Sequence, residues 1–540
     1  MLTISRQFRR LGMLTLLLAG LVVALWRPGL VYAGGVVGNG TPASCTEAAF
    51  NAALTGGGLI TFNCGGAKTI TFTEYKQISA DTTLDGGDVI TLSGGNAASL
   101  FQVFDPRRLA LQNITLAEGK SVGMAAGAIE NFGTTTISNS TLRDNVSTTT
   151  GGAIVNYGTL NLNNTTLSKN QAESNGGAIY NDGGTVTINN SQVIENVALS
   201  KGGSGGGLAN WAGTANIQSS TFSYNSNDYR GGAININNGT VNIQNSTFSQ
   251  NSSRSGGAIH INGGTVFITA SLITNNSAHY GGGIDNGNRL VVSQTIVSLN
   301  RATGNGGGIN NGDEATLDGV TINGNTAENQ GGGIYLESDM VLTNSTLSGN
   351  IAERGGGGLY SDTRLVTLTN VTVSGNHANA NGGGGILKGT GLMSLTFVSV
   401  VSNTATAFGG GVSNSGSGEM SLQNTVLANN SVGNCDGSGF TSLGHNLAND
   451  DSCNAALNQP TDKRGATITL PLGSLANNGG PTLTHLPLNG NPAINGGVCI
   501  DGISTDQRGL PRLAGPACDA GAVEFGSTRA VYLPIVLKNP

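Results

Sequence analysis

The sequence predicts an all-β protein, a right-handed parallel β-helix with about 12 regular coils, irregular N-terminal coils and a cap at each end. Three observations predict this fold. A small-small-aliphatic step recurs between residues 126 and 431, an Asn follows each step at a nearly constant distance, and apolar residues alternate with polar ones between these two marks. A single coil cannot bury its inner face alone, whereas stacked coils form a continuous core.

The aliphatic residue of each step, which we call the anchor, recurs every 25 to 29 residues. The anchors are Ile129, Ile154, Ile179, Leu208, Ile234, Ile259, Ile284, Ile309, Ile334, Leu359, Ile386 and Val412. An Asn follows each anchor after 16 to 18 residues, at 145, 170, 196, 225, 251, 276, 300, 325, 350, 376, 403 and 430. We expect this Asn to lie in a turn and to bond its copies on neighbouring coils, as stacked Asn ladders do.

Between these marks the apolar residues have a period of two, as in Val241/Ile243 and Val266/Ile268. This period is typical of strands, which place alternate side chains on one face. Gly, Asn and Asp turn residues separate the segments, as at Asn238-Gly239. Each repeat therefore predicts three short strands.

The composition excludes several other classes of protein. The chain has 540 residues with 87 Gly and 10% charged residues, and Gly disfavours a helix-rich fold. Lys plus Arg number 25 against 31 Asp plus Glu, without a basic cluster beyond the N-terminus, so we expect no nucleic-acid partner. The fixed repeat and 37% hydrophobic content argue against disorder.

Residues 1–33 resemble a secretory signal peptide, with Arg6, Arg9 and Arg10 before an apolar run and Ala33 at the cleavage point. An uncleaved anchor is the alternative. After cleavage we expect no transmembrane helix, because no other apolar run is long enough to span a bilayer. We divide the remaining chain into an N-terminal cap with irregular coils (34–125), the regular repeats (126–431), a C-terminal cap (432–529) and a short apolar tail (530–540).

Six cysteines flank the repeats, and none lies within them. An even number suits an oxidising compartment, and no CxxC spacing indicates a metal site. We expect the local pairs Cys45–Cys64, Cys435–Cys453 and Cys499–Cys518, although sequence leaves other pairings open. The segment 46–54 predicts a short helix over the first coil, with Ser44 or Thr46 as its N-cap.

The Gly-Gly-Ala-Ile and Phe-x-x-Asn steps resemble the repeats of polymorphic outer-membrane proteins and related right-handed β-helix surface proteins. The lead-in, with Cys45-Thr46-Glu47-Ala48-Ala49 and Leu84-Asp85-Gly86-Gly87, resembles the same group. Near the end, Asp506-Gln507-Arg508-Gly509 and Cys518-Asp519-Ala520-Gly521 resemble a choice-of-anchor region. The resemblance implies extracellular or cell-surface placement, often with an adhesive role. The chain departs from autotransporter-like members because too few residues follow the last repeat for a membrane barrel.

Many parallel β-helices act on polysaccharides, and such chemistry requires clustered catalytic residues. The coils hold no Asp-Asp pair or Gly-His-Gly motif, and their acidic residues are scattered. We assign no catalytic residue, metal or cofactor. The best constellation is the column one residue after each anchor, where His260, Asp285, Asn310, Tyr335 and Tyr360 follow one another. They form a candidate glycan-binding strip, and the alternative is an ordinary solvated sheet face with two exposed tyrosines.

The function predicted from sequence is a non-catalytic, secreted or cell-surface scaffold or adhesin whose partners are extracellular glycans or cell-surface components. The alternative is a polysaccharide-degrading lyase or glycoside hydrolase. A third class, ice or mineral binding through Thr ladders, is weaker because the Thr185/Thr187 pair does not continue where Leu290 and Met340 occur.

Overall fold

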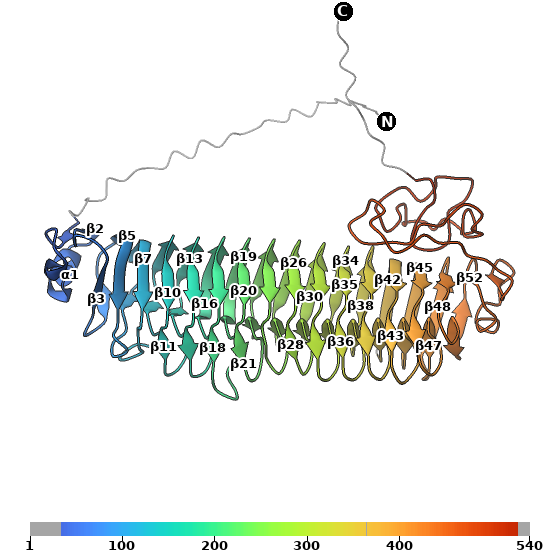
Figure 1. Ribbon diagram of the computed structural model, residues 1–540, viewed down its shortest axis with the longest axis horizontal. Coiled ribbons are helices and arrows are strands. Elements are labelled where there is room, and N and C mark those ends of the chain that lie inside the picture. Colours follow the sequence, from blue (N-terminus) through green and yellow to red (C-terminus); the bar gives the residue numbers. More distant parts are fainter. Residues whose placement is uncertain (1–33, 363, 528–540) are drawn as a thin grey trace, which may run out of the picture.

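The computed structural model describes residues 34–362 and 364–527, which form a long parallel β-helix (Figure 1). The predicted fold class is confirmed. The solenoid has about 16 turns, more than the twelve regular repeats, because strands are added at both ends. The predicted signal peptide (1–33) and apolar tail (530–540) lie outside the described residues.

Each regular coil contains three strands, as predicted, and ten coils add a short fourth strand. The first strands, which carry the anchors in the regular coils, are β4 (Lys76–Ile78), β6 (Phe101–Val103), β8 (Ile129–Asn131), β12 (Ile154–Asn156), β22 (Ile234–Ile236), β25 (Ile259–Ile261), β29 (Ile284–Asn286), β33 (Ile309–Asn311), β37 (Ile334–Leu336), β41 (Leu359–Ser361), β44 (Ile386–Lys388), β47 (Val412–Asn414) and β50 (Cys435–Gly437). Two strands combine a first and a second segment, β16 (Ile179–Asn189) and β19 (Leu208–Gln218).

The second strands form the adjoining face of the solenoid. They are β1 (Val36–Val37), β2 (Gly58–Phe62), β9 (Thr134–Ser138), β13 (Thr159–Asn163), β23 (Thr240–Gln244), β26 (Thr265–Thr269), β30 (Arg289–Ser293), β34 (Ala315–Asp318), β38 (Met340–Thr343), β48 (Glu419–Gln423) and β51 (Phe440–Ser442). Four strands combine a second and a third segment, β5 (Thr82–Ser93), β7 (Arg108–Ala117), β42 (Leu365–Ser374) and β45 (Leu392–Val401).

The third and fourth strands complete each coil. The third strands are β3 (Lys68–Thr71), β10 (Thr141–Arg143), β14 (Thr166–Ser168), β17 (Gln192–Ile194), β20 (Thr221–Ser223), β24 (Thr247–Ser249), β27 (Leu272–Thr274), β31 (Ile296–Ser298), β35 (Thr321–Asn323), β39 (Thr346–Ser348), β49 (Val426–Ala428), β52 (Leu447–Ala448) and β53 (Lys463–Arg464). The fourth strands are β11 (Val146–Ser147), β15 (Gln171–Ala172), β18 (Val197–Ala198), β21 (Ser226–Asn227), β28 (Ser277–Ala278), β32 (Arg301–Ala302), β36 (Thr326–Ala327), β40 (Ile351–Ala352), β43 (His377–Ala378) and β46 (Thr404–Ala405).

The recurrent Asn forms a continuous buried ladder inside the solenoid. Each one donates from Nδ2 to Oδ1 of the next, from Asn145 through the twelve predicted positions to Asn430 and on to Asn434, over distances of 2.8 to 3.1 Å. Each Nδ2 also reaches a strand carbonyl, as from Asn276 to Phe248 at 3.0 Å. The amides are therefore fully paired where no water reaches them, and the expected Asn stacking is confirmed.

A second Asn ladder runs two residues after the anchors, where the sequence analysis expected none. Asn131, Asn156, Asn181 and Asn210 donate from one to the next at 2.7 to 2.8 Å. Ile236 and Ile261 replace Asn in the following coils, so this ladder is interrupted. Both Asn and Ile therefore occur in this column. Because Asn does not recur there in every repeat, the sequence spacing did not reveal the second ladder.

The predicted N-terminal helix is α1 (Glu47–Leu54), and Thr46 is its N-cap, with its side chain accepting from the Ala49 backbone N–H. Phe50 points from α1 into the first coils and is fully buried. Its ring centroid lies 4.9 Å from that of Phe72. The helix therefore covers the open end of the core, at the blue end in Figure 1.

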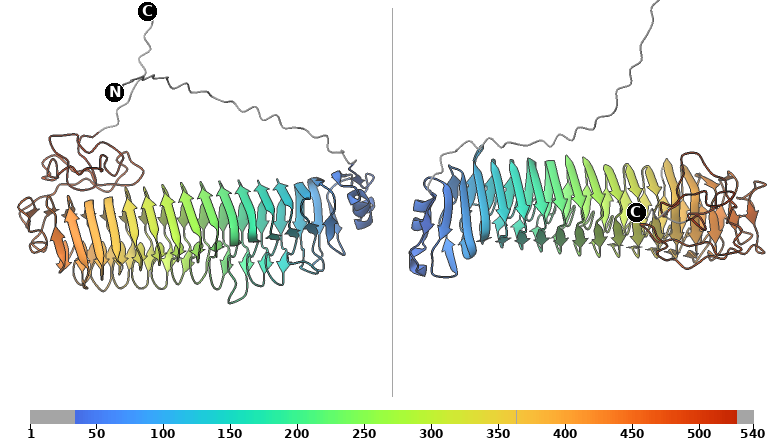
Figure 2. Two further views of the ribbon diagram at one scale, coloured as in Figure 1. Left: turned by 180° about the vertical axis from the view of Figure 1, so that it is seen from behind. Right: turned by 90° about the horizontal axis from the view of Figure 1, so that it is seen from above.

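The chain continues coiling beyond residue 431, because β50, β51 and β52 pair with β47, β48 and β49. Cys453 and Leu457 then join the buried core at this end. Residues 466–527 fold back along the flank of the last coils instead of extending the rod (Figures 1 and 2). The structure contains the three disulfides expected from the sequence, Cys45–Cys64, Cys435–Cys453 and Cys499–Cys518.

Candidate functional site

The five predicted glycan-binding residues lie in one column, at the middle positions of five successive first strands. The backbone ladder pairs His260 with Asp285, Asp285 with Asn310, Asn310 with Tyr335 and Tyr335 with Tyr360. Neighbouring strands lie about 4.8 Å apart, so each side chain can contact the next. The structure therefore brings all five residues together.

In the first three residues of this column, Asp285 is hydrogen-bonded to both of its neighbours. His260 Nδ1 lies 3.0 Å from Asp285 Oδ2, and Asn310 Nδ2 donates to Asp285 Oδ1 at 2.6 Å. On the preceding coil, Asn235 Oδ1 is buried without a hydrogen-bond partner among the described residues, and so is His260 Nε2. The strand register pairs Asn235 with His260, so two neighbouring residues each have a buried polar atom without a hydrogen-bond partner among the described residues.

The alternative of an ordinary solvated face with exposed tyrosines is wrong for most of this column. His260, Asp285 and Tyr335 are only 6%, 8% and 9% exposed. The glycine-rich turn before each anchor also packs directly against the strand backbone. A Cβ on Gly256 would lie 2.8 Å from the His260 backbone nitrogen, and one on Gly331 would lie 2.7 Å from that of Tyr335.

Tyr335 and Tyr360 form a parallel stack at the other end of the column, with ring centroids 5.2 Å apart and an interplanar angle of 4°. The Tyr335 hydroxyl donates to Glu337 Oε1 at 3.1 Å. Burial, and then the charge of Glu337, raise the pKa of Tyr335 well above its usual range. Both phenols therefore stay neutral and remain hydrogen-bond donors at physiological pH.

An open depression of about 470 Å³ lies beside these tyrosines, on the turns that join first strands to second strands. It is lined by Glu337, Ser338, Asp339, Asp362, Arg364, Thr390 and Gly391. Thr390 donates to Asp362 Oδ1 at 2.6 Å, which fixes that carboxylate. Three carboxylates and one guanidinium on three coils make this lining acidic.

Lys388 is a functional candidate that the sequence analysis missed. It sits two residues after its anchor, points inward and is fully buried, with Nζ 3.1 Å from Ser361 Oγ. Burial lowers the pKa of Lys388 to about 8, although the nearby charges of Asp362 and Asp339 oppose that shift. The sequence did contain a signal for this candidate. Lys388 is a charged residue in a column that otherwise holds Asn, Ser and aliphatic residues.

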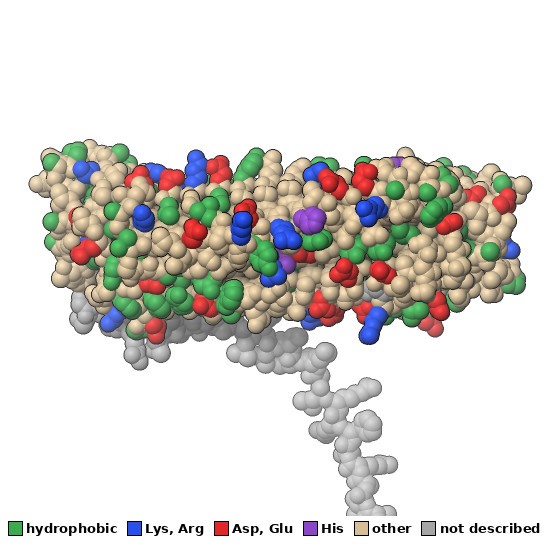
Figure 3. All heavy atoms as spheres, turned by 90° about the horizontal axis from the view of Figure 1, so that it is seen from below, with side chains coloured by type: hydrophobic (Ala, Val, Ile, Leu, Met, Phe, Trp, Pro, Cys, Tyr) green, Lys and Arg blue, Asp and Glu red, His purple; other side chains and the backbone are tan. Residues whose placement is uncertain are grey.

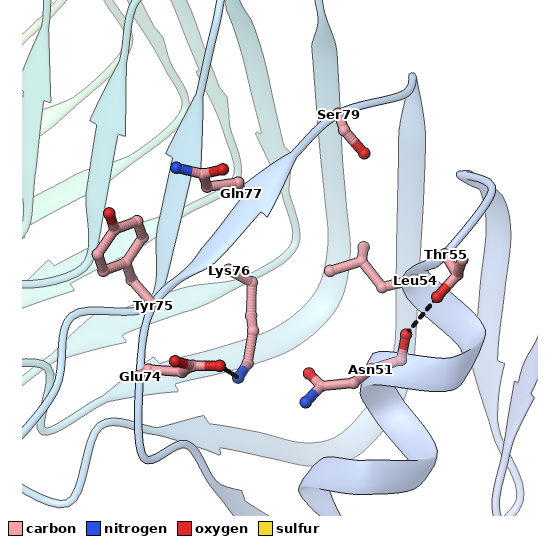
Figure 4. Close-up of a pocket in the computed structure, with 8 residues that line it drawn as sticks. All are labelled: Asn51, Leu54, Thr55, Glu74, Tyr75, Lys76, Gln77 and Ser79. Atoms are coloured by element: carbon pink, nitrogen blue, oxygen red, sulfur yellow. Dashed lines mark hydrogen bonds and ion pairs between the residues drawn. The ribbon is translucent and has the colours of Figure 1, made fainter.

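A second depression, of about 510 Å³, lies at the N-terminal cap between α1 and β4 (Figure 4). Lys76 borders it but is 5% exposed and is held by Glu47 at 2.6 Å. Its Nζ also lies 5.0 Å from the Phe72 ring centroid. These contacts tie the helix to the first coil, so we assign this lysine a structural role.

The threonine column on the second strands is more regular than the sequence indicated. Thr185 pairs with Thr159 and Thr214 in an outward column, whereas Leu290 and Met340 belong to the inward column of Val266 and Ala315. The outward column reads Thr134, Thr159, Thr185, Thr214, Thr240 and Thr265 before Arg289 ends it. It is therefore unbroken over six coils, although it does not continue into the later ones.

Seen from below, the rod carries charged side chains singly or in small groups among polar ones (Figure 3). Among the described residues, no three His, Cys, Asp or Glu side chains are grouped so that they could hold a metal ion. Within 34–362 and 364–527, no helix has the length and apolar character needed to cross a membrane.

Comparison with known proteins finds one family model that matches segments of the repeats. The model of the Chlamydia polymorphic membrane protein repeat matches residues 164–182, 245–262 and 319–337. Each match runs from the turn before a third strand to just past the next anchor, and so covers the Asn ladder and the glycine-rich step. Three segments of this β-helix therefore match the polymorphic membrane protein repeat. No curated protein sequence matches it.

Two solved structures resemble the chain weakly. Pectate lyase Pel9A has 15% identity and a TM-score of 0.28, over 91% of this chain and 96% of the lyase. The A-module of the Azotobacter vinelandii mannuronan C-5 epimerase AlgE6 has 12% identity and a TM-score of 0.21, over 76% of this chain and 99% of the module. No residue role is transferred from either protein.

Proposed function

We propose that the protein is a secreted or cell-surface β-helix scaffold, adhesin-like and non-catalytic, that contacts extracellular glycans along its side. The polymorphic membrane protein repeats support surface placement, since the family is named for membrane proteins. The three disulfides support an oxidising compartment. The stacked Asn ladders support a rigid rod, because every coil is bonded to the next through buried amides.

The observation that carries glycan contact is the Tyr335–Tyr360 stack beside the polar depression. Aromatic rings next to fixed polar groups are the usual lining of ligand sites, where the rings supply contact area and the polar groups orient the ligand. Tyr360 is the more accessible of the two rings. We assign the contact to Tyr360 with Tyr335, and we assign His260, Asp285 and Asn310 to positioning the strands beneath.

The test is retention of the purified protein on a panel of acidic and neutral polysaccharides, with product release measured in parallel and with calcium present or absent. Tyr360→Ala should weaken retention about tenfold, whereas Tyr280→Ala, a 36% exposed tyrosine next to the fourth-strand sheet, should leave it unchanged. Retention without product release supports a binding rod. Failure to bind any polysaccharide contradicts the proposal.

One observation favours the alternative of a polysaccharide-degrading enzyme. The Lys388 amine, with its pKa near 8, lies close to the carboxylates of Asp339 and Asp362 that line the depression. An amine of lowered pKa is suited to proton transfer near neutral pH. Product release that is abolished in Lys388→Met, while the far-ultraviolet circular dichroism stays unchanged, would establish this alternative.

A further inference from the structure

An uncharged sheet face occupies the outward side of six successive second strands. We call it the threonine face, and it comprises Thr134, Thr136, Ser138, Thr159, Asn161, Asn163, Thr185, Thr187, Asn189, Thr214, Asn216, Gln218, Thr240, Asn242, Gln244, Thr265, Phe267 and Thr269. None of these side chains is charged, and Arg108 and Arg289 border its two ends. With strands about 4.8 Å apart, the face extends on the order of 24 Å along the rod.

The polar side chains of this face are held in place before any ligand arrives. Asn242 Nδ2 donates to Asn216 Oδ1 at 2.8 Å, and Asn189 Nδ2 donates to Asn163 Oδ1 at 3.2 Å. The strands beneath are paired in register from Thr134 to Thr269. A ligand bound here would therefore order few side chains, and that entropy cost is a large part of what binding must overcome.

A row of exposed aromatic side chains borders the same coils. Phe104, Phe132, Tyr157 and Trp211 are 41%, 37%, 38% and 43% exposed. Phe132 and Tyr157 stack with centroids 4.8 Å apart, and each lies two residues before a threonine of the face. These side chains remain partly exposed, and a row of exposed apolar side chains of this kind marks an interaction surface.

The chemistry of the two surfaces together selects the partner. A polyanion or polycation finds no opposite charge on the threonine face, so electrostatic complementarity favours an uncharged ligand. Hydroxyl and amide groups donate to and accept from hydroxyls, while aromatic rings contact apolar ring faces. A neutral polysaccharide offers both kinds of group at every repeat.

We propose that the threonine face and the bordering row of Phe104, Phe132, Tyr157 and Trp211 bind a neutral polysaccharide whose chain lies along the rod. This inference rests on the proposed glycan-contacting function and names its ligand class and a second surface. The Tyr335–Tyr360 depression lies further along the same line of turns between first and second strands. The polysaccharide can thus extend from one surface toward the other.

The test uses the full-length purified protein with microcrystalline cellulose, chitin and soluble mixed-linkage β-glucan as neutral probes and polygalacturonate as the anionic probe. Thr185→Lys/Thr214→Lys should weaken retention on at least one neutral probe tenfold or more. Tyr157→Ala/Trp211→Ala should act in the same direction. Ser277→Lys/Thr326→Lys, on the fourth-strand sheet, is the matched control and should retain binding.

Because two added lysines could impair folding, Thr185→Val/Thr214→Val provides a milder variant, and circular dichroism checks both. Retention on a neutral probe that is unaffected by every face variant overturns this inference and leaves the proposed function standing. Retention on polygalacturonate alone overturns the neutral ligand class. Absence of retention on every probe defeats the proposed function itself. Ice-recrystallisation inhibition that the Thr185→Lys/Thr214→Lys variant loses, without polysaccharide retention, overturns the ligand class in favour of ice.

Discussion

Asn251 donates from Nδ2 to Oδ1 of Asn276 at 3.0 Å, and the Asn251 backbone N–H donates to the same oxygen at 2.9 Å. Two donors of one coil therefore share one acceptor of the next. Asn276 in turn bonds Asn300 in the same manner. Every asparagine of the ladder serves three coils, because its Nδ2 also reaches back to a strand carbonyl.

Asn276→Ala should destabilise the central coils, because it leaves both Asn251 donors without an acceptor in a buried site. Each unsatisfied group costs about 1–3 kcal/mol. Urea unfolding followed by circular dichroism measures the shift in midpoint. Asn262→Ala removes an exposed amide that bonds only Asn237, and it should leave the midpoint nearly unchanged. Equal shifts for the two variants would contradict the role given to the ladder.

Arg512→Ala should release the C-terminal region from the flank of the solenoid. The Arg512 side chain is 1% exposed, donates to Asn370 Oδ1 at 2.6 Å and lies 3.7 Å from the Phe397 ring centroid. Removing it leaves the buried Asn370 Oδ1 without this donor, and an unsatisfied buried acceptor costs about 1–3 kcal/mol. Limited proteolysis should then cleave within residues 466–527 before the coils. The exposed Arg354→Ala is the control and should resist cleavage like the parent protein.

Docking of the C-terminal region should weaken as pH rises from about 4.5 to 7. Burial raises the pKa of Glu524 from 4.5 to about 7, so the folded state retains a proton that the unfolded state releases in this interval. The contribution to stability is therefore complete below pH 4.5 and is lost as pH rises through 7. Hydrogen exchange of residues 466–527 at pH 5 and pH 7.5 measures it.

The control for this pH dependence is Glu524→Gln, which cannot titrate and should flatten the profile in that interval. His485 titrates with the opposite sign, because burial lowers its pKa and its neutral form is paired with Ser374 and Gly473. His485 is present in both the parent protein and Glu524→Gln, so comparing the two at each pH cancels the contribution of His485. A Gln variant with the same profile as the parent would show that Glu524 does not control docking.

Asp285→Ala should lower stability without affecting polysaccharide retention. The carboxylate accepts from Asn310 and contacts His260 where all three side chains are largely enclosed, so its loss leaves two polar partners unsatisfied, at about 1–3 kcal/mol each. Thermal unfolding and polysaccharide retention, measured on the same sample, separate the two effects. Loss of retention at unchanged thermal stability would instead make this pair a direct ligand contact.

The repeat spacing and the period of two predicted the fold, the three strands of each coil and the Asn stacking, and the N-cap signal predicted the helix at Thr46. Each of these depends on local periodicity or capping. The candidate column was also predicted, since Ile259 and Ile284 must align for their coils to pack, and His260 and Asp285 then align too. Its burial was not, because it depends on how closely other parts of the folded chain approach these side chains. A one-dimensional pattern does not report that distance.

The sequence by itself determined that the chain stacks coils, which residues point inward along most strands, and that cysteines lie only outside the repeats. Only the tertiary structure decided that residues 466–527 pack on the flank, that Lys388 lies beneath an acidic depression, and that six threonines form one face. Periodic burial is a local property of the chain, repeated in every coil. Docking, enclosure and the register between coils of unequal length depend on contacts between residues far apart in sequence, which no local pattern encodes.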